Sequence, residues 1–464
     1  MRSVKKEIYS IILVCLFAIL SCGNLINETA LNDDAARPSS AGGFGFTELE
    51  KSYSLSGEIR IEKIDSENYY MAGSVTGESS TDVDNVWFSS ISNKGEFFKG
   101  GFLVSDYDDR VRRVKVLDSK NVIIFADRYY ESGDIDFIIV KYNRNKGVLW
   151  DYCFGNDKKN RIFDATETVD GGIVVTGMSY YSVLGAMSYI TFIMKIDANG
   201  NLVWEKNYKS YFSVFMPSEI HRIGEEEYIV SGLCLNALTY KFRTFFARMD
   251  SSGNILSSMY INAINRHSML AGSVVREDDG MTAVISLVGS SDSDVLAVIN
   301  FDSDMNVLST REFSFPDLNV RGKIVRGEDE DIIVAGMLNS TAGNGLYFLK
   351  LTEEGVIKSL NTKIYDSEIY DIYDVYFGSA EDENGIIYMC KYSNSVYSSA
   401  DGKVFLDSFN FGQSDKNYSR ETLLTKGETL YAESTEYETG DVELDSDTIV
   451  VEEKGEADLV LVVN

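Results

Sequence analysis

The sequence predicts an all-β protein that forms a single β-propeller of four-stranded blades. A motif of strand, tight turn and strand recurs about every fifty residues. Apolar and polar residues alternate with period two, and ten-residue helical patterns are nearly absent. Propellers repeat one four-stranded sheet at such a period. We expect eight blades, with seven as the alternative, closed into a ring by an N-terminal strand.

The tight turn of the motif is its clearest element. Residues 192–204 read FIMKIDANGNLVW, an apolar strand, a glycine turn and a second strand that ends in an aromatic residue. Each copy has glycine or asparagine at the turn because both tolerate positive φ. The turn positions are Gly45, Gly95, Gly147, Gly200, Gly253, Asn306 and Gly355.

Each blade is expected to have four strands. Three of them precede the turn, and the fourth follows it. The run before each turn from Gly95 onward is apolar: Val86–Ile91, Phe137–Tyr142, Ile190–Ile196, Phe245–Met249, Val295–Phe301 and Leu346–Leu351. Upstream lies a strand with a small residue near its end, which allows close sheet approach: Tyr69–Gly73, Val122–Ala126, Ile173–Gly177, Tyr228–Gly232 and Ile332–Gly336. Before that comes a first strand: Glu58–Ile64, Arg110–Leu117, Phe163–Val169 and Gly322–Arg326.

The two ends of the chain predict how the ring closes. Residues 45–53 parallel residues 200–208 but have no strands of their own before them. Residues 458–463 resemble the strand before a turn. We expect the N-terminal strand to be the outer strand of the last blade, which removes exposed sheet edges. Residues 368–464 would then supply seven further strands, although the pattern weakens after Gly402.

The N-terminus is typical of an export signal. Arg2, Lys5 and Lys6 precede an apolar run, residues 11–20, that is too short to span a bilayer as a helix. Residues 19–22, Ile-Leu-Ser-Cys, resemble the bacterial lipobox, and the resemblance implies that Cys22 becomes the lipidated first residue of the mature protein. The alternatives are an ordinary signal peptide cut nearby and an uncleaved anchor.

The expected organisation is a signal peptide over 1–21, a flexible tether over 22–43 and the propeller over 44–464. The tether is polar and ends in Ser-Ser-Ala-Gly-Gly, a composition too poor in apolar residues for a core. We expect the protein to be lipid-anchored in the cell envelope, with the membrane and the leaflet left open.

Charge and composition exclude several function classes. The chain has 43 basic and 72 acidic residues, a net charge of −29, so it should repel nucleic acid and anionic membrane surfaces. Without Cys15 of the signal and the lipidated Cys22, three cysteines remain: Cys153, Cys234 and Cys390. Their odd number and their places in separate repeats argue against a disulfide framework. His221 and His267 are the sole histidines and no CxxC occurs, which argues against zinc and against histidine acid–base chemistry.

Acidic residues just before the third strand are candidates for a cation site. A ring of carboxylates on the loop face would bind calcium or a cationic partner, since hard cations prefer several oxygen ligands. The alternative is that each aspartate caps its own turn. No other cofactor is predicted. The residues are Asp82, Asp84, Asp134, Asp136, Asp292 and Asp294.

Tyrosine pairs follow the second strand in two neighbouring repeats. Tyr129 and Tyr130 occupy the place in one repeat that Tyr180 and Tyr181 occupy in the next. They would form an aromatic rim for a glycan or a peptide, because tyrosine combines contact area with a polar hydroxyl. The alternative is packing at strand ends, where tyrosine is common.

Two segments carry a family resemblance. Residues 197–204 and 145–150, which end in Trp204 and Trp150, resemble the tryptophan-docking repeat of quinoprotein-like propellers. Residues 170–177, DGGIVVTG, resemble the other half of repeats of bacterial surface and periplasmic propeller lipoproteins. The resemblance covers roughly residues 45–410 and implies a fold rather than an activity. Two repeats alone keep the tryptophan, and no quinone site, sialidase-type Asp box or Ser/His/Asp set is evident.

The sequence therefore predicts an exported, lipid-anchored propeller that acts as a non-catalytic binding or scaffold protein at the bacterial cell envelope. Its partners would be the membrane, through the lipid, and an envelope protein; no catalytic residue is assigned. The alternative is a quinoprotein-like oxidoreductase or a glycan-active enzyme that uses the propeller funnel. Polar residues converging around a perturbed carboxylate would favour the enzyme.

Overall fold

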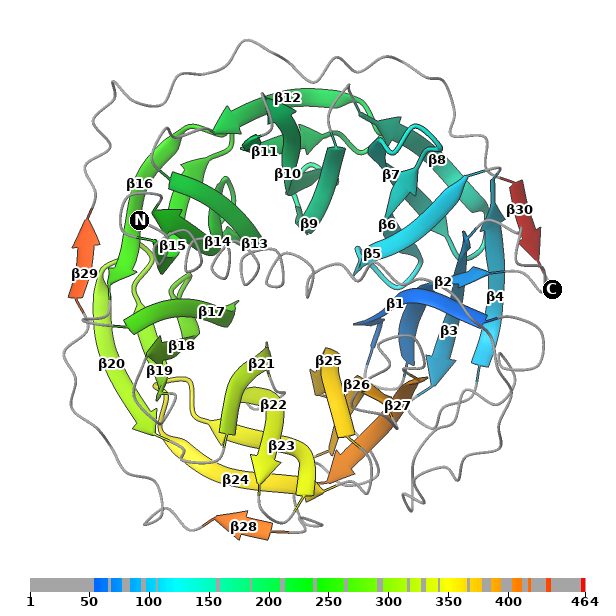
Figure 1. Cartoon of the computed structure of the whole chain (residues 1–464). Coiled ribbons are helices and arrows are strands. Elements are labelled where there is room, and N and C mark those ends of the chain that lie inside the picture. The colour runs from blue at the N-terminus through cyan, green and yellow to red at the C-terminus, as the bar shows by residue number, and fades with distance from the viewer. Residues whose placement is uncertain are drawn as a thin grey trace, which may run out of the picture.

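A computed structural model shows a ring of antiparallel sheets around a central axis (Figure 1). Every element in the described residues is a β-strand, which confirms the all-β propeller. The structure describes residues 54–65, 68–76, 84–92, 97–105, 107–155, 159–183, 186–208, 213–236, 240–262, 266–289, 295–314, 318–326, 331–340, 343–364, 368–377, 385–393, 403–410, 416–418, 431–434 and 460–463.

Six blades each contain four strands that follow one another in the chain and pair antiparallel from the axis to the rim. Blade 1 is β1 (Ser54–Lys63), β2 (Asn68–Thr76), β3 (Asp84–Ser92) and β4 (Phe97–Val104). Blade 2 is β5 (Asp108–Val116), β6 (Asn121–Tyr129), β7 (Ile135–Asn143) and β8 (Gly147–Phe154). Blade 3 is β9 (Lys159–Glu167), β10 (Ile173–Val183), β11 (Ala186–Ile196) and β12 (Leu202–Tyr208).

The other three complete blades repeat this arrangement. Blade 4 is β13 (Ser213–Ile223), β14 (Glu227–Asn236), β15 (Lys241–Asp250) and β16 (Ile255–Asn262). Blade 5 is β17 (Arg266–Val275), β18 (Met281–Gly289), β19 (Val295–Phe301) and β20 (Val307–Ser314). Blade 6 is β21 (Leu318–Arg326), β22 (Ile332–Ser340), β23 (Gly343–Leu351) and β24 (Ile357–Ile364). The strands expected from the sequence for these blades are confirmed.

The expected number of blades is wrong. A sheet of three strands, β25 (Glu368–Phe377), β26 (Gly385–Ser393) and β27 (Lys403–Asn410), stands between blade 6 and blade 1. The described residues thus form six complete four-stranded blades and this three-stranded sheet, not eight or seven complete blades. Residues 45–53, the expected closing strand, lie outside the described residues.

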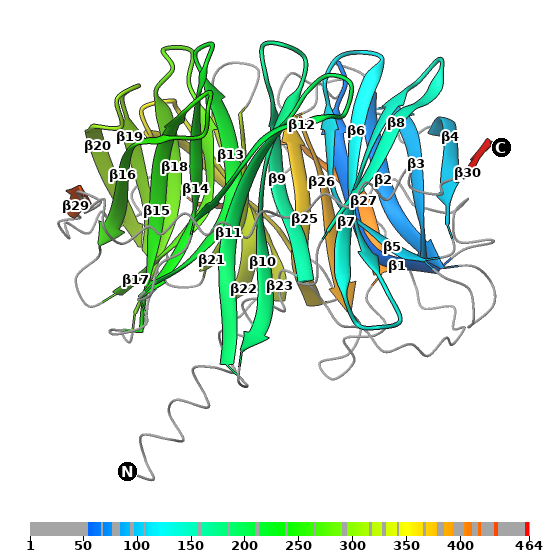
Figure 2. The ribbon, with the colours of Figure 1, turned by 90° about the horizontal axis from the view of Figure 1, so that it is seen from above.

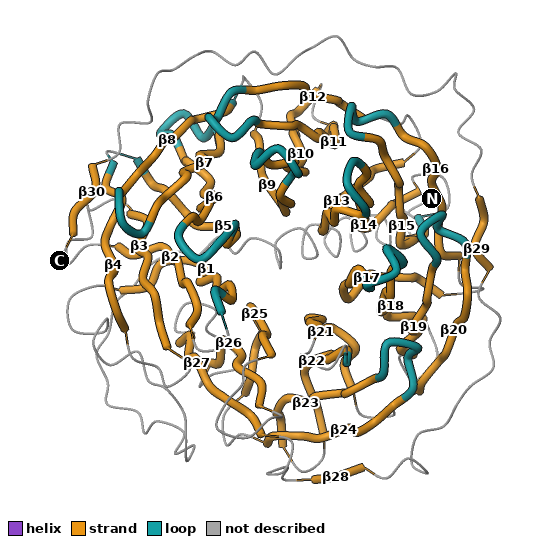
Figure 3. The backbone as a smooth tube through the Cα atoms, turned by 180° about the vertical axis from the view of Figure 1, so that it is seen from behind, coloured by secondary structure: helices purple, strands orange, loops and turns teal. Residues whose placement is uncertain are grey.

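The C-terminal strands explain the error in the count. β28 (Lys416–Tyr418), β29 (Tyr431–Ser434) and β30 (Val460–Val463) pair with the outer strands β24, β16 and β4, as fifth strands outside the rim (Figures 1 and 3). The segment expected to be the strand before a turn therefore adds to the edge of blade 1. These strands cover open edges, which limits pairing with other chains, but they build no blade.

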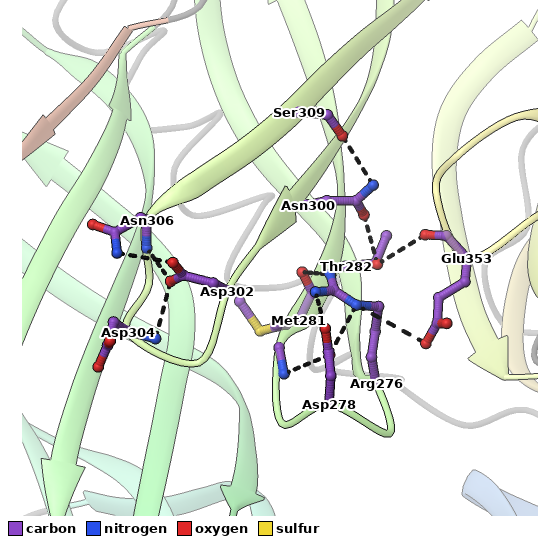
Figure 4. A network of polar contacts seen from close by, with 11 residues as sticks. Arg276, Asp278, Met281, Thr282, Asn300, Asp302, Asp304, Asn306, Ser309 and Glu353 are labelled. Atoms are coloured by element: carbon purple, nitrogen blue, oxygen red, sulfur yellow. Dashed lines mark hydrogen bonds and ion pairs between the residues drawn. The ribbon is translucent and has the colours of Figure 1, made fainter.

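The turn between the third and fourth strands has a common design. Asp197, Asp250 and Asp302 each accept backbone N–H bonds from residues two and four positions further on, at 2.8–3.0 Å. The residue three positions after the aspartate has positive φ: Gly200, Gly253 and, in blade 5, Met305 with φ 68°. The expected turn position Asn306 is therefore wrong. Its side-chain amide instead donates to Asp302 at 2.9 Å, as Figure 4 shows.

Neighbouring blades are joined at these turns. The indole N–H of Trp150 donates to the carbonyl of Ala198 at 3.0 Å, and that of Trp204 donates to the carbonyl of Ser251 at 2.9 Å. Each tryptophan thus docks on the turn of the next blade. Blade 5 has no tryptophan there. Its Thr282 contacts the Glu353 carbonyl of blade 6 at 3.3 Å, beside Arg276 (Figure 4).

The hydrophobic core lies between adjacent blades. Period-two alternation gives each sheet two faces, and in the middle strands both are buried because blades cover both sides. Phe137 of blade 2 stacks on Phe192 of blade 3 at 5.6 Å, and every residue of β19 is buried. The core clusters join residues of successive blades, so each blade depends on its neighbours for burial.

Candidate functional site

Polar and aromatic residues of blades 2 and 3 gather at one end of the ring. Consecutive strands are antiparallel, so the starts of β5 and β9 lie beside the ends of β6 and β10. This is the end from which the β10–β11 hairpin projects in Figure 2. A β-bulge between Val111 and Arg113 turns Arg112 out of the regular register of β5.

A buried ion pair forms the base of this region. Arg128 of β6 donates two hydrogen bonds to Asp109 of β5, both at 2.8 Å, and the two side chains are 4% and 1% exposed. Ser105 donates a third bond to Asp109 at 2.7 Å. Burial raises the pKa of Asp109, while the bonds from Arg128 and Ser105 lower it. A bidentate pair of this kind fixes both side chains.

Two tyrosines cover the buried pair. The ring of Tyr107 lies 4.8 Å from the Arg128 guanidinium and meets the ring of Tyr130 edge-on at 5.2 Å. The Tyr130 hydroxyl is 3.5 Å from the sulfur of Cys153. Burial raises the pKa of the Cys153 thiol, so it stays protonated at neutral pH and is a poor nucleophile.

A second network links blade 2 to blade 3. Arg112 and Arg161 both approach one carboxylate oxygen of Asp127, at 2.7 and 3.5 Å. Both also donate to the hydroxyl of Tyr129, at 3.1 and 3.3 Å. The Arg161 guanidinium lies 5.8 Å from the ring of Tyr180. Two blades therefore supply the cations, and one buried aspartate orients them.

A third arginine extends this network toward blade 1. Arg110 lies over the ring of Tyr129 at 4.8 Å and pairs with Asp84 of β3 at 3.0 Å. We call the partly exposed assembly the Arg–Tyr surface. It consists of Tyr107, Arg110, Arg112, Tyr129, Tyr130, Arg161 and Tyr180.

The Arg–Tyr surface is suited to binding rather than to bond breaking. Its guanidinium groups are hydrogen-bond donors without an acceptor atom, and the neighbouring carboxylates are engaged in holding them. The side chains are held before any partner arrives, which lowers the entropic cost of association. Arginine and tyrosine are also the residues that dominate binding hot spots.

Three of the six predicted acidic residues lie within the described residues, and each has its own contacts. Asp84 pairs with Arg110, and Asp134 accepts a bond from Ser132 at 2.8 Å in its own turn. Asp136 is buried in β7 near Tyr130. Asp82, Asp292 and Asp294 lie outside the described residues. Within the described part of the chain, no group of three His, Cys, Asp or Glu residues could hold a metal ion.

The predicted tyrosines lie within the Arg–Tyr surface, with one exception. Tyr129, Tyr130 and Tyr180 belong to it, whereas the side chain of Tyr181 is not described and its backbone pairs with Ser188. The sequence interpretation missed the arginines. A signal was present, because residues 110–113, Arg-Val-Arg-Arg, form a basic cluster in a strongly acidic chain.

A polar cluster on inner strands β13 and β17 was also missed. His221 Nε2 lies 3.0 Å from the Ser273 hydroxyl, and that hydroxyl donates to Glu219 at 2.6 Å. Because the hydroxyl proton points to the carboxylate, the imidazole does not receive it, and the geometry differs from that of an activated serine. The cluster joins blade 4 to blade 5. His267, the other histidine, accepts a bond from the backbone of Phe242.

Comparisons with known proteins find distant structural likenesses and no sequence relative. No family model and no curated protein matches the chain. Among solved structures, a subtype N11 neuraminidase-like protein of A/flat-faced bat/Peru is similar over 64% of this chain and 86% of its own, at 8% identity and a TM-score of 0.38. BBS1N, solved in complex with ARL6DN, is similar over 74% and 94%, at 10% identity and the same TM-score. Such distant likenesses indicate no function.

The predicted export signal and Cys22, the predicted lipidation site, lie outside the described residues. Among the described residues there is no helix with the length and apolarity that crossing a bilayer requires. The two cysteine side chains that are described, Cys153 and Cys234, are both buried and free.

Proposed function

We propose that this protein is a lipid-anchored binding protein of the bacterial cell envelope, which contacts an envelope protein through the Arg–Tyr surface without catalysis. The export signal and the lipobox-like residues 19–22 support the location. The partner would present carboxylates and apolar groups, which pair with guanidinium groups and tyrosine rings respectively. A bound calcium ion remains a proposal for the acidic loops.

One observation carries the binding role, namely that buried aspartates hold the arginines beneath an aromatic cover. Asp109 and Asp127 are fully buried, whereas Tyr107, which lies against Arg128 of the Asp109 pair, is 38% exposed. Exposed tyrosines over arginines add little to stability alone, because an exposed cation–π contact is worth about 0.5–1 kcal/mol. The same groups are worth more when a partner excludes water from them.

Affinity capture tests the binding role. We expect the full chain, crosslinked in envelopes and purified, to retain a stoichiometric envelope protein that Tyr107→Ser reduces at least about tenfold, since hot-spot tyrosines contribute about 2 kcal/mol or more. Tyr240→Asn is the matched control, because Tyr240 is also an exposed loop tyrosine but lies in blade 4 and has a left-handed φ of 52° that asparagine tolerates. Equal recovery with both variants would contradict the proposal.

Lipid labelling tests the location separately. We expect the wild-type chain to incorporate labelled palmitate and to sediment with membranes, and Cys22→Ser to lose both properties because the acyl-bearing thiol is gone. Cys15→Ser serves as the control, since Cys15 lies within the predicted signal. Labelling that persists in Cys22→Ser would show that the lipobox interpretation is wrong.

A further inference from the structure

A small pocket opens at the other end of blade 2, away from the Arg–Tyr surface. Its volume is about 330 Å³, at the lower end of the range for small-molecule sites. The turn between β5 and β6 and the turn between β7 and β8 form its rim, and strands β2 and β7 supply its wall. The lining residues are Tyr70, Ser119, Lys120, Tyr142, Arg144 and Asn145.

Tyr70 is the unusual lining residue of this pocket, because of its hydroxyl. Tyr70 is 1% exposed, and its buried hydroxyl has no hydrogen-bond partner among the described residues. Its ring is fixed by Phe88, which stacks on it at 6.1 Å, and by Tyr142 at 6.4 Å. Burying a hydroxyl without a partner costs about 1–3 kcal/mol, and phenylalanine would avoid this cost. Such a hydroxyl is accounted for if a ligand accepts a hydrogen bond from it.

The charges at the rim specify the ligand class. Lys120 and Arg144 are the charged lining residues, and both are cationic in a chain of net charge −29. Arg144 is oriented by bonds from its backbone N–H to the Lys120 carbonyl at 2.9 Å and from its guanidinium to the Ser119 carbonyl at 3.1 Å. Burial raises the pKa of Tyr70, so its hydroxyl stays protonated and donates.

We propose that this pocket binds a small organic anion, with an acceptor oxygen on the Tyr70 hydroxyl and its charge facing Lys120 and Arg144. The aromatic walls, Tyr70 and Tyr142, favour a flat apolar body next to the anionic group. A carboxylate and a phosphate monoester share this chemistry. The site is independent of the Arg–Tyr surface and of the partner proposed for it.

Ligand-observed NMR titration of the full chain in detergent tests the site with benzoate, phenyl phosphate and neutral benzyl alcohol. We expect at least one anion to bind about tenfold or more tightly than benzyl alcohol, and Tyr70→Phe to weaken that binding about tenfold, as the loss of one hydrogen bond to a charged group predicts. The anion that binds identifies carboxylate or phosphate as the source. Lys120→Gln should weaken it as well.

Two controls separate binding from folding. Tyr347→Phe alters a fully buried tyrosine of blade 6 and should leave anion binding unchanged. Tyr70→Phe should keep or raise the melting temperature, because it removes an unpaired buried hydroxyl. If neither anion binds better than benzyl alcohol, or if Tyr70→Phe binds like the wild type, the pocket holds water only and the proposal is overturned.

Discussion

Replacing Arg128 by methionine should lower the free energy of unfolding by about 3–5 kcal/mol, the usual cost of leaving one partner of a buried ion pair alone. The change leaves the Asp109 carboxylate, which is 1% exposed, without its two bonds from the guanidinium. Urea titration followed by circular dichroism would measure the loss. Because Arg128 also supports the ring of Tyr107, partner capture should fall in the same variant.

A double variant provides the control for this prediction. Arg128→Met with Asp109→Leu removes both charges, so it should be more stable than the sum of the two single variants implies. Replacing Lys195 by methionine should change stability less, because its partner Asp170 is 57% exposed and stays in contact with water when the pair is broken. Additive effects in the double variant would show that the two buried charges do not depend on each other.

Replacing Gly200 by alanine should cost about 2–4 kcal/mol, through a strained backbone and a clash between blades. Gly200 has φ +93°, and a Cβ there would lie 2.2 Å from the ring of Tyr152 in blade 2. The turn carries the carbonyl of Ala198 that accepts the bond from Trp150, so moving it weakens the docking of blade 2 on blade 3. The melting temperature and the urea midpoint would both report the loss.

Gly133 is the matched control for Gly200. Its φ is +85°, nearly the same, but nothing lies within 4 Å of a Cβ built on it. Gly133→Ala should therefore cost only the backbone strain, about 1–2 kcal/mol. If the two variants lose equal stability, the added Cβ at Gly200 does not disturb the contact with blade 2, and the predicted clash between blades is wrong.

The sequence could predict the blades because their signal is local. Strands recur in the same order in every complete blade, and each expected apolar run falls within a strand. The blade count failed because the length of residues 368–464 was taken to supply seven blade strands, whereas β28, β29 and β30 in this segment pair with outer edges far away in the sequence. Local patterns do not say which edge a strand joins. The turn of blade 5 shows a similar limit. Its residue with positive φ is the buried Met305, and methionine is not a residue type that indicates positive φ.

Part of the Arg–Tyr surface could be predicted because the repeat places equivalent residues of neighbouring blades near each other. Tyr129 and Tyr180 occupy equivalent positions in two repeats, so their proximity follows from blade geometry. The partnership of Arg112 and Arg161 at Asp127 depends on a bulge in β5 and on contacts between two blades, neither of which a single sequence specifies. The pocket at Tyr70 likewise arises from turns of blade 2 meeting a strand of blade 1.

Photocrosslinking from position 107 in living cells is the most direct test of the Arg–Tyr surface as a binding site. A benzophenone amino acid in place of Tyr107 should crosslink to one envelope protein, and the same group in place of Tyr240 should not, since Tyr240 is exposed on blade 4. A single adduct that depends on position 107 is the result we expect. No adduct from position 107, or the same adduct from both positions, would contradict the proposed function.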